Sequence, residues 1–405
     1  MRNRSAKTVH ISFRQLVDIP STTHGVFGLY RYPAKFIPHV IAYVLKHYGK
    51  PHMSVFDPFA GYGTVGTVAR LYNLDYEMWD LNPILEVLHR VTLLKVPKID
   101  PSAVVSEMRR SKEEYCPDWS NVAYWFHEQV LPVLKRAWGY YHSLQEEVER
   151  LLLTIPLLKV SRLFSYDDPG RMKLSKSPRS IARVEGILRR GVEREFYGHL
   201  SNEIDSLVRR LRQYSDMSPR PVRSVVKAGI DTLTETLTET RDLLVTSPPY
   251  MQSQEYIRYA KMDLFWLGHP EEEIRRLAKL EIPYRTVPRV RINSPTFHIL
   301  REKIDEEKML RVYDNYFHAI VGFFDRIQKQ IGYRMFIFVG RASMRGRPVP
   351  IDEIVAEHLV ANGWRHEETL VDKISARRMF RYGKNPATQI EDARTPSERL
   401  VVLSK

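Results

Sequence analysis

The stretch that decides the fold is Ser54-Val55-Phe56-Asp57-Pro58-Phe59-Ala60-Gly61-Tyr62-Gly63-Thr64. It places two glycines directly after a short apolar strand and before a predicted helix. Glycine permits a tight turn and brings backbone N–H groups close to a ligand, while the N-terminus of the next helix offers a positive field. A lone Gly-x-Gly is equally typical of a plain strand-to-helix turn, so this stretch alone does not identify a site.

A second apolar segment, Tyr76–Trp79, ends in Asp80, about 20 residues beyond the glycines. An acidic side chain at that point can bind both hydroxyls of a ribose. The alternative is that Asp80 is the N-cap of the next helix. The two segments together predict the opening of a doubly wound α/β sheet.

The rest of the chain divides by its hydrophobic pattern. Helical periodicity dominates from about Asp100 to Tyr214, where several tryptophans and a basic tail occur. We expect three regions: 1–99, the first part of the core; 100–220, a helical and basic insertion with a target-recognition role; and 221–405, the second part of the core. Further predicted elements are a helix at Ile37–Tyr48, strands at Val222–Ala228, Asp242–Thr246, Met335–Val339 and Leu400–Leu403, a helix at Ile351–Asn362, and basic loops at Pro283–Arg291 and Arg341–Arg347.

Composition limits the classes of function. The chain has 405 residues, 43% of them hydrophobic, and a formal net charge of +14, which favours a polyanionic partner such as nucleic acid without proving one. No window has the roughly 18 uninterrupted apolar residues of a membrane span, and no secretory signal is visible, so we expect a cytoplasmic protein. The single cysteine, Cys116, argues against a Cys-based zinc cluster and against the usual thiol attack on cytosine C6.

The predicted strand Asp242–Thr246 runs into Thr246-Ser247-Pro248-Pro249-Tyr250. Two successive prolines cannot continue a sheet, so the chain must turn out here. The turn can aim a carbonyl and the Ser247 hydroxyl at a ligand, and Tyr250 offers a flat surface for a base. The alternative is a rigid turn with a buried tyrosine.

Both motifs resemble those of the amino-methyltransferases that modify DNA at cytosine N4 or adenine N6. The segment Asp57–Thr64 resembles the family's cofactor motif, Ser247–Tyr250 its catalytic motif, and Arg31–Pro38 the segment that closes over the methionine end of the cofactor. The resemblance implies a Rossmann-like, S-adenosylmethionine-dependent methyltransferase core with a mostly helical insertion. It covers roughly residues 24–96 and 222–403, without any match for the insertion.

The resemblance also implies roles for residues. Asp80 would bind the cofactor's ribose, while Lys35 and Phe36 would close over its methionine end, unless that loop only packs on the edge of the sheet. Asp231, after a predicted strand, would border the adenine or else cap a surface turn. The candidate cofactor-binding residues are Lys35, Phe36, Asp57, Pro58, Phe59, Ala60, Gly61, Gly63, Thr64, Asp80, Asn82 and Asp231; the catalytic ones are Ser247, Pro248, Pro249 and Tyr250; and those for the substrate are Tyr250, Arg341, Arg377 and Arg378.

The chemistry accounts for these residue types. An exocyclic amine of a base is a poor nucleophile because its lone pair is delocalised into the ring. Two acceptors on its N–H groups, the Ser247 side chain and the Pro248 carbonyl, would favour the pyramidal form for in-line methyl transfer. The base must be flipped out of a duplex or taken from a single strand, with Tyr250 stacking on it. No metal and no covalent intermediate are required.

In this family, serine before Pro-Pro-Tyr is more often associated with methylation of cytosine N4, and aspartate in that place with methylation of adenine N6. We therefore expect a cytosine-N4 methyltransferase acting on DNA. The alternatives are an RNA cytosine-N4 methyltransferase, including one for ribosomal RNA, a DNA adenine-N6 methyltransferase, and a non-catalytic nucleic-acid-binding protein that kept the fold. The target sequence and the oligomeric state are not readable from the chain.

Overall fold

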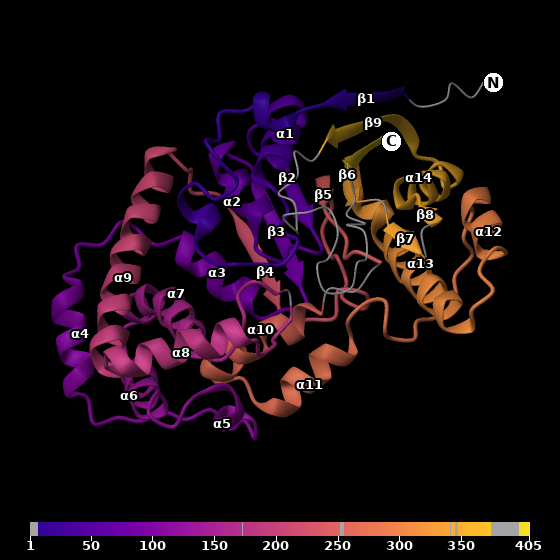
Figure 1. Cartoon of the computed structure of the whole chain (residues 1–405). Helices are drawn as coiled ribbons and strands as arrows, with labels where there is room; N and C mark the ends of the chain where they lie inside the picture. The colour runs from indigo at the N-terminus through magenta and orange to yellow at the C-terminus, as the bar shows by residue number, and fades with distance from the viewer. Residues whose placement is uncertain (1–6, 172, 252–254, 341, 345–346, 374–396) are drawn as a thin grey trace.

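An eight-stranded sheet forms the centre of the computed structural model, which describes residues 7–171, 173–251, 255–340, 342–344, 347–373 and 397–405 (Figure 1). The strand order is β1-β9-β10-β6-β5-β2-β3-β4. All neighbours are parallel except that β10 is antiparallel to both β6 and β9. The strands are β1 (Lys7–Ile11), β2 (Ser54–Asp57), β3 (Asp75–Asp80), β4 (Ser224–Ala228), β5 (Arg241–Thr246), β6 (Ile331–Gly340), β9 (Arg365–Lys373) and β10 (Ser397–Ser404).

The strand order reverses at β2. From β2 the chain adds β3 and β4 on one side, and it later adds β5 and β6 on the other. Ligands of such sheets bind outside the carboxyl ends of the strands at this reversal. The Rossmann-like core predicted from the sequence is thus confirmed, and its binding edge lies where β2 and β5 end.

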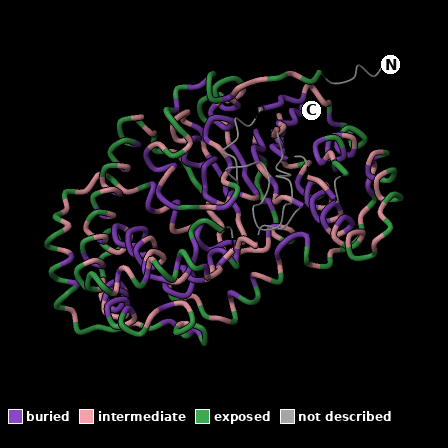
Figure 2. The backbone as a smooth tube through the Cα atoms, viewed as in Figure 1, coloured by how far each residue is buried: buried purple, intermediate pink, exposed green. Residues whose placement is uncertain are grey.

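Alternating residues of the central strands face two different helical layers. Leu243 and Val245 of β5 belong to the apolar cluster that includes α1 (Pro38–Tyr48) and α2 (Thr64–Leu71). Leu244 between them belongs to the cluster that includes α13 (Glu307–Ile327) and α14 (Ile351–Ala361). Since successive side chains of a strand point to opposite faces, helices cover both sides of the sheet, and Figure 2 shows its strands as a largely buried centre.

Helices alone fill the described chain between α3 (Ile84–Thr92) and β4, apart from loops (Figure 1). They pack into one apolar cluster that also contains residues of α3 and of α10 (Tyr256–Trp266). The region boundaries at residues 99 and 220 remain a prediction. The helices are α4 (Pro101–Arg110), α5 (Val122–Trp125), α6 (Leu131–Ser143), α7 (Glu147–Phe164), α8 (Pro178–Arg190) and α9 (Val192–Asp216).

Several elements differ from the sequence expectation. The predicted basic loop at Arg341–Arg347 is partly strand, since β7 (Ala342–Met344) pairs with β8 (Arg347–Val349). The edge strand β1 and its neighbour β9 were not predicted, because their alternation is weak. The remaining elements are α11 (Glu271–Lys279), α12 (Pro295–Arg301) and 3₁₀ turns at Phe13–Gln15, Gly25–Gly28 and Gln328–Gln330. None of the described helices has the length and apolar character to cross a bilayer.

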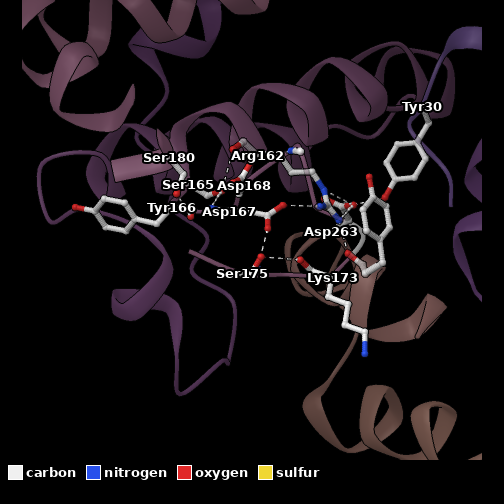
Figure 3. A network of polar contacts seen from close by, with 12 residues as sticks. Tyr30, Arg162, Ser165, Tyr166, Asp167, Asp168, Lys173, Ser175, Ser180 and Asp263 are labelled. Carbon is white, nitrogen blue, oxygen red and sulfur yellow. Dashed lines mark hydrogen bonds and ion pairs between the residues drawn. The ribbon is translucent and has the colours of Figure 1, made fainter. Parts of the chain in front are cut away.

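One buried ionic network joins the helical region to the core (Figure 3). Arg162 of α7 donates from Nε to both carboxylate oxygens of Asp263 at 2.9 Å, and from Nη1 to Asp167 at 3.0 Å. The Tyr30 hydroxyl donates to the same Asp263 carboxylate. Asp263 lies on α10 with its side chain 1% exposed, against 15% for Arg162. Arg162 therefore holds α7, α10 and the segment before α1 together.

We expect Arg162→Met to lower the free energy of unfolding by about 3–5 kcal/mol, because it leaves the Asp263 carboxylate buried without its cation. The measurement is urea unfolding followed by circular dichroism. Arg311→Met is the matched control, since the Arg311 side chain is 70% exposed and pairs only with Glu307 one turn away. It should change the value by less than about 0.5 kcal/mol. Equal effects of the two variants would contradict the role of the network.

Candidate active site

The site begins where β2 and β5 end side by side. Asp57 is the last residue of β2 and Thr246 the last of β5. The Thr246 hydroxyl donates to the Asp57 carboxylate at 2.7 Å, and the backbone N–H of Phe59 donates to the same oxygen at 3.2 Å. Both side chains are buried, Asp57 at 1% exposure. This hydrogen bond ties the glycine-rich turn to the turn that starts at Ser247.

Two glycines give the first turn its shape. Gly61 has a φ of +51° and Gly63 a φ of +81°, and Gly63 is the N-cap of α2. A Cβ at Gly61 would stand 2.9 Å from Cε1 of Tyr32, so both the backbone conformation and the space exclude a side chain. The turn thus brings its backbone close to the Tyr32 ring.

Asp80 fixes this turn from the end of β3. Its carboxylate accepts from the N–H of Gly61 at 2.8 Å and from the N–H of Asn82 at 2.7 Å. Asn82, rather than Asp80, bonds the first turn of α3, through the N–H of Ile84 at 3.1 Å. The alternative of Asp80 as a helix N-cap is therefore wrong. Each carboxylate oxygen keeps a second lone pair for a ligand.

One cavity joins the two turns. Ten of the predicted site residues line it: Lys35, Phe36, Phe59, Ala60, Gly61, Asp80, Asn82, Asp231, Ser247 and Pro249. Residues from both motifs, Gly61 and Ser247 among them, therefore face one space. Asp57, Pro58, Gly63, Thr64, Pro248 and Tyr250 are not among its lining residues. Arg341, Arg377 and Arg378 lie outside the described residues.

Carboxylates dominate the polar part of the lining. Burial raises the pKa of Asp80 to about 6 and that of Glu281 to about 7. Asp231 accepts from Arg285 at 2.6 Å and from the N–H of Leu233 at 3.2 Å. Asp231 thus organises a turn and also borders the cavity, and its contact with the adenine remains a prediction. A ligand with hydroxyls or a positive charge suits this lining.

Aromatic side chains form another wall. Tyr32 stacks on Tyr256, the first residue of α10, with ring centroids 6.1 Å apart and planes at 24°. Phe36 stacks on Phe338 of β6 at 5.3 Å. Lys35 donates to the carbonyls of Thr22, at 2.8 Å, and Phe27, and burial lowers its pKa to about 8. The loop both packs on the sheet and lines the cavity.

Tyr250 lies apart from the other motif residues. Its hydroxyl donates to Glu398 of β10 at 2.7 Å, and burial followed by the Glu398 charge raises its pKa well above the usual range. This contact anchors the second turn to the antiparallel strand. Stacking of Tyr250 on a base remains a prediction.

Sequence reasoning missed several residues of the cavity. Glu281, 6% exposed, accepts from the N–H of Ile257 at 2.9 Å and so caps the start of α10. Tyr256 and Ile257 come from α10 itself. Tyr256 and Ile257 come shortly after the second motif in the chain, and Glu281 comes after α11. Nothing in their local sequence pattern indicates a binding site. Of the lining residues not predicted, Tyr32, Ala34 and Tyr62 stood within quoted motifs.

Comparison with known proteins adds to this geometry. No family model matches the chain. The chain is 23% identical over 386 residues to the type II methyltransferase M.MvaI of Kocuria varians, a match that covers 86% of this chain and 84% of that protein. The chain is similar to this methyltransferase over most of its length, which supports a methyltransferase function.

Two solved structures of the rRNA methyltransferase aviRa from Streptomyces viridochromogenes also align with the present chain. They cover 97% of this chain and 96% of theirs, at 12% and 11% identity and TM-scores of 0.32 and 0.31. At these TM-scores the likeness carries no argument. Similarity to a methyltransferase implies S-adenosylmethionine as the methyl donor.

A pH experiment tests the burial of Asp57 in the present protein. Burial raises its pKa to about 7, whereas an aspartate of the unfolded chain loses its proton near about pH 4. Between these values the folded chain binds more protons, so this group's contribution to the free energy of unfolding falls as pH rises. We compare wild type with Asp57→Asn, since other groups titrate in both.

The difference in unfolding free energy between wild type and Asp57→Asn should shift against wild type by up to about 1.4 kcal/mol per pH unit between pH 5 and 7. It should level off at higher pH. Urea unfolding at closely spaced pH values measures it. A constant difference would mean that Asp57 is ionised throughout this range, so that burial does not raise its pKa.

Proposed function

We propose that this methyltransferase transfers a methyl group from S-adenosylmethionine to an exocyclic amino nitrogen of a nucleic-acid base, cytosine N4 in DNA. The observation that carries the proposal is the cavity lined by both Gly61 and Ser247. The relationship to a type II methyltransferase and the net charge of +14 support it. The serine before Pro-Pro-Tyr favours cytosine over adenine.

The residues present fit this cofactor. The bare backbone at Gly61 lets the Tyr32 ring lie against the turn, and both residues line the cavity. Asp80 offers free lone pairs to ribose hydroxyls, and Asp231 stands on the same lining for the adenine. Apolar groups such as Phe36 and Phe59 complete the walls. When bound, S-adenosylmethionine supplies an electrophilic methyl group on a cationic sulfur.

The chain's own residues would hold the target amine. The Ser247 side chain and the Pro248 carbonyl would accept its two N–H groups, so that the nitrogen turns pyramidal and its lone pair points into the cavity. Such acceptors act most strongly in the transition state, where the nitrogen gains positive charge. The new nitrogen–carbon bond would replace the donor's sulfur–methyl bond, whose electron pair stays on sulfur in the neutral thioether that leaves. The amine then loses one proton to solvent, and no covalent enzyme intermediate is needed.

The decisive experiment offers matched duplex DNA, single-stranded DNA and ribosomal RNA to the enzyme with a deuterated methyl donor. Mass spectrometry of the nucleosides names the methylated atom. We expect N4-methylcytosine in DNA. Label on adenine N6, or on RNA alone, would reassign the substrate, and an absence of label on every substrate would overturn the proposal.

Ser247→Ala should lower the transfer rate about 100-fold or more, because it removes one acceptor of the target amine. Cofactor affinity, measured by calorimetry, should change little. Ser106→Ala is the control, because that hydroxyl is exposed on α4 and bonds only the carbonyl of Ser102. A Ser247→Ala variant with the activity of the control would refute the role of Ser247.

Asp80→Ala should weaken S-adenosylmethionine binding by about tenfold or more, since it removes a charged acceptor and releases the Gly61 turn. Asp75→Ala is the matched control at the opposite end of β3, where Asp75 accepts from the N–H of Arg223 at 3.0 Å. Calorimetric titration gives both affinities. Equal affinities for the two variants would exclude Asp80 from the cofactor site.

A further inference from the structure

A groove separate from the active-site cavity lies where the helical region meets α10 and α11. Its lining combines aromatic rings, cations and aliphatic side chains: Trp119, Asn121, Trp125, Leu174, Ile257, Arg258, Lys261, Ile274, Arg275 and Ala278. No carboxylate belongs to this lining among the described residues. Ile257 lines both the groove and the active-site cavity, so the two are neighbours.

The aromatic rings of the groove form a layered surface. Trp119 lies parallel to Phe265 of α10 at 4.7 Å and 10°, and Trp125 lies nearly parallel to Trp119 at 6.3 Å and 20°. Trp125 is half-buried, and the adjoining Tyr124 is 55% exposed. The core tryptophans Trp138 and Trp266 are fully buried by contrast. Aromatic surface therefore remains accessible beside the cavity.

Cations accompany the rings. Lys261 lies 5.9 Å from the centre of the Trp119 ring, and Lys176 lies 3.7 Å from that of Tyr124. Arg258, 55% exposed, pairs with Glu255 at 2.8 Å, an ion pair that a phosphate could replace. Successive bases of a single strand stack on aromatic rings while cations follow the backbone. The groove has both components.

An unsatisfied donor points to a ligand independently. The Trp119 side chain is only 4% exposed, and its indole Nε1 has no hydrogen-bond partner among the described residues. A buried N–H without a partner costs about 1–3 kcal/mol.

We infer that this groove binds an unpaired nucleotide next to the target base by stacking it on Trp125, beside which the Tyr124 ring stands edge-on. The inference rests on the proposed function and extends it. It requires that the enzyme hold its substrate with the flanking nucleotide unstacked. A flipped target base and a displaced neighbour would then occupy two cavities that share Ile257.

The test measures the affinity of the full chain for a fluorescent single-stranded oligonucleotide by anisotropy, with methyl transfer assayed in parallel. Trp125→Ala should weaken binding by about 10-fold to 100-fold, the range for loss of one base–aromatic stack, and Tyr124→Ala should weaken it less. Trp125→Phe, which keeps a ring, should retain most of the affinity. Cofactor affinity should be unchanged in all three variants.

Tyr333→Ala is the off-site control, because Tyr333 is 40% exposed near the start of β6, at the end of the sheet opposite the site. It should bind like wild type. Lys261→Gln should also reduce the slope of log affinity against log salt by about 0.7, the value for one phosphate contact to a single strand.

The outcomes separate the two proposals. If wild type methylates the oligonucleotide but Trp125→Ala and Tyr124→Ala bind it as tightly as Tyr333→Ala does, the groove is not a nucleotide site and the proposed function stands. If wild type neither binds nor methylates any nucleic acid, the proposed function falls and the groove inference falls with it.

Discussion

The hydrogen bond between Thr246 and Asp57 is the contact on which the site depends. It joins the last residues of β2 and β5 at 2.7 Å, where the strand order of the sheet reverses. Two chain segments almost 200 positions apart thereby turn out of the sheet side by side. With both groups buried, the bond is shielded from water and resists competition. This hydrogen bond fixes the position of the glycine-rich turn relative to the Ser247 turn.

A second constraint comes from the side of the cavity away from the sheet. The Arg162–Asp263 network connects α7 to α10 and reaches Tyr30, two residues before Tyr32. Tyr32 and Tyr256 stack on each other and line the cavity. The helical region therefore supports the cavity wall through α10. The same packing creates the groove at Trp119 and Trp125, so the groove and the cavity share one support.

The sequence predicted local features better than long-range ones. The glycine turn, the acid at the end of β3 and the strand before Ser247 each depend on a few consecutive residues, and the structure has them at the expected positions. Glu281 and Tyr256 reach the cavity only because α10 and the loop after α11 fold back on it. The hydrophobic periodicity of the sequence does not indicate that these segments fold back on the cavity. Tyr250 illustrates the same limit, since its partner Glu398 is on a strand 148 residues later.

The central claim is that one cavity holds a methyl donor and a target amine in contact. A crystal structure with S-adenosylhomocysteine, the product of transfer, measures this most directly. The account predicts the ribose on Asp80 and the sulfur facing Ser247 across open space. A sulfur directed away from Ser247, or separated from it by the wall of the cavity, would contradict the account.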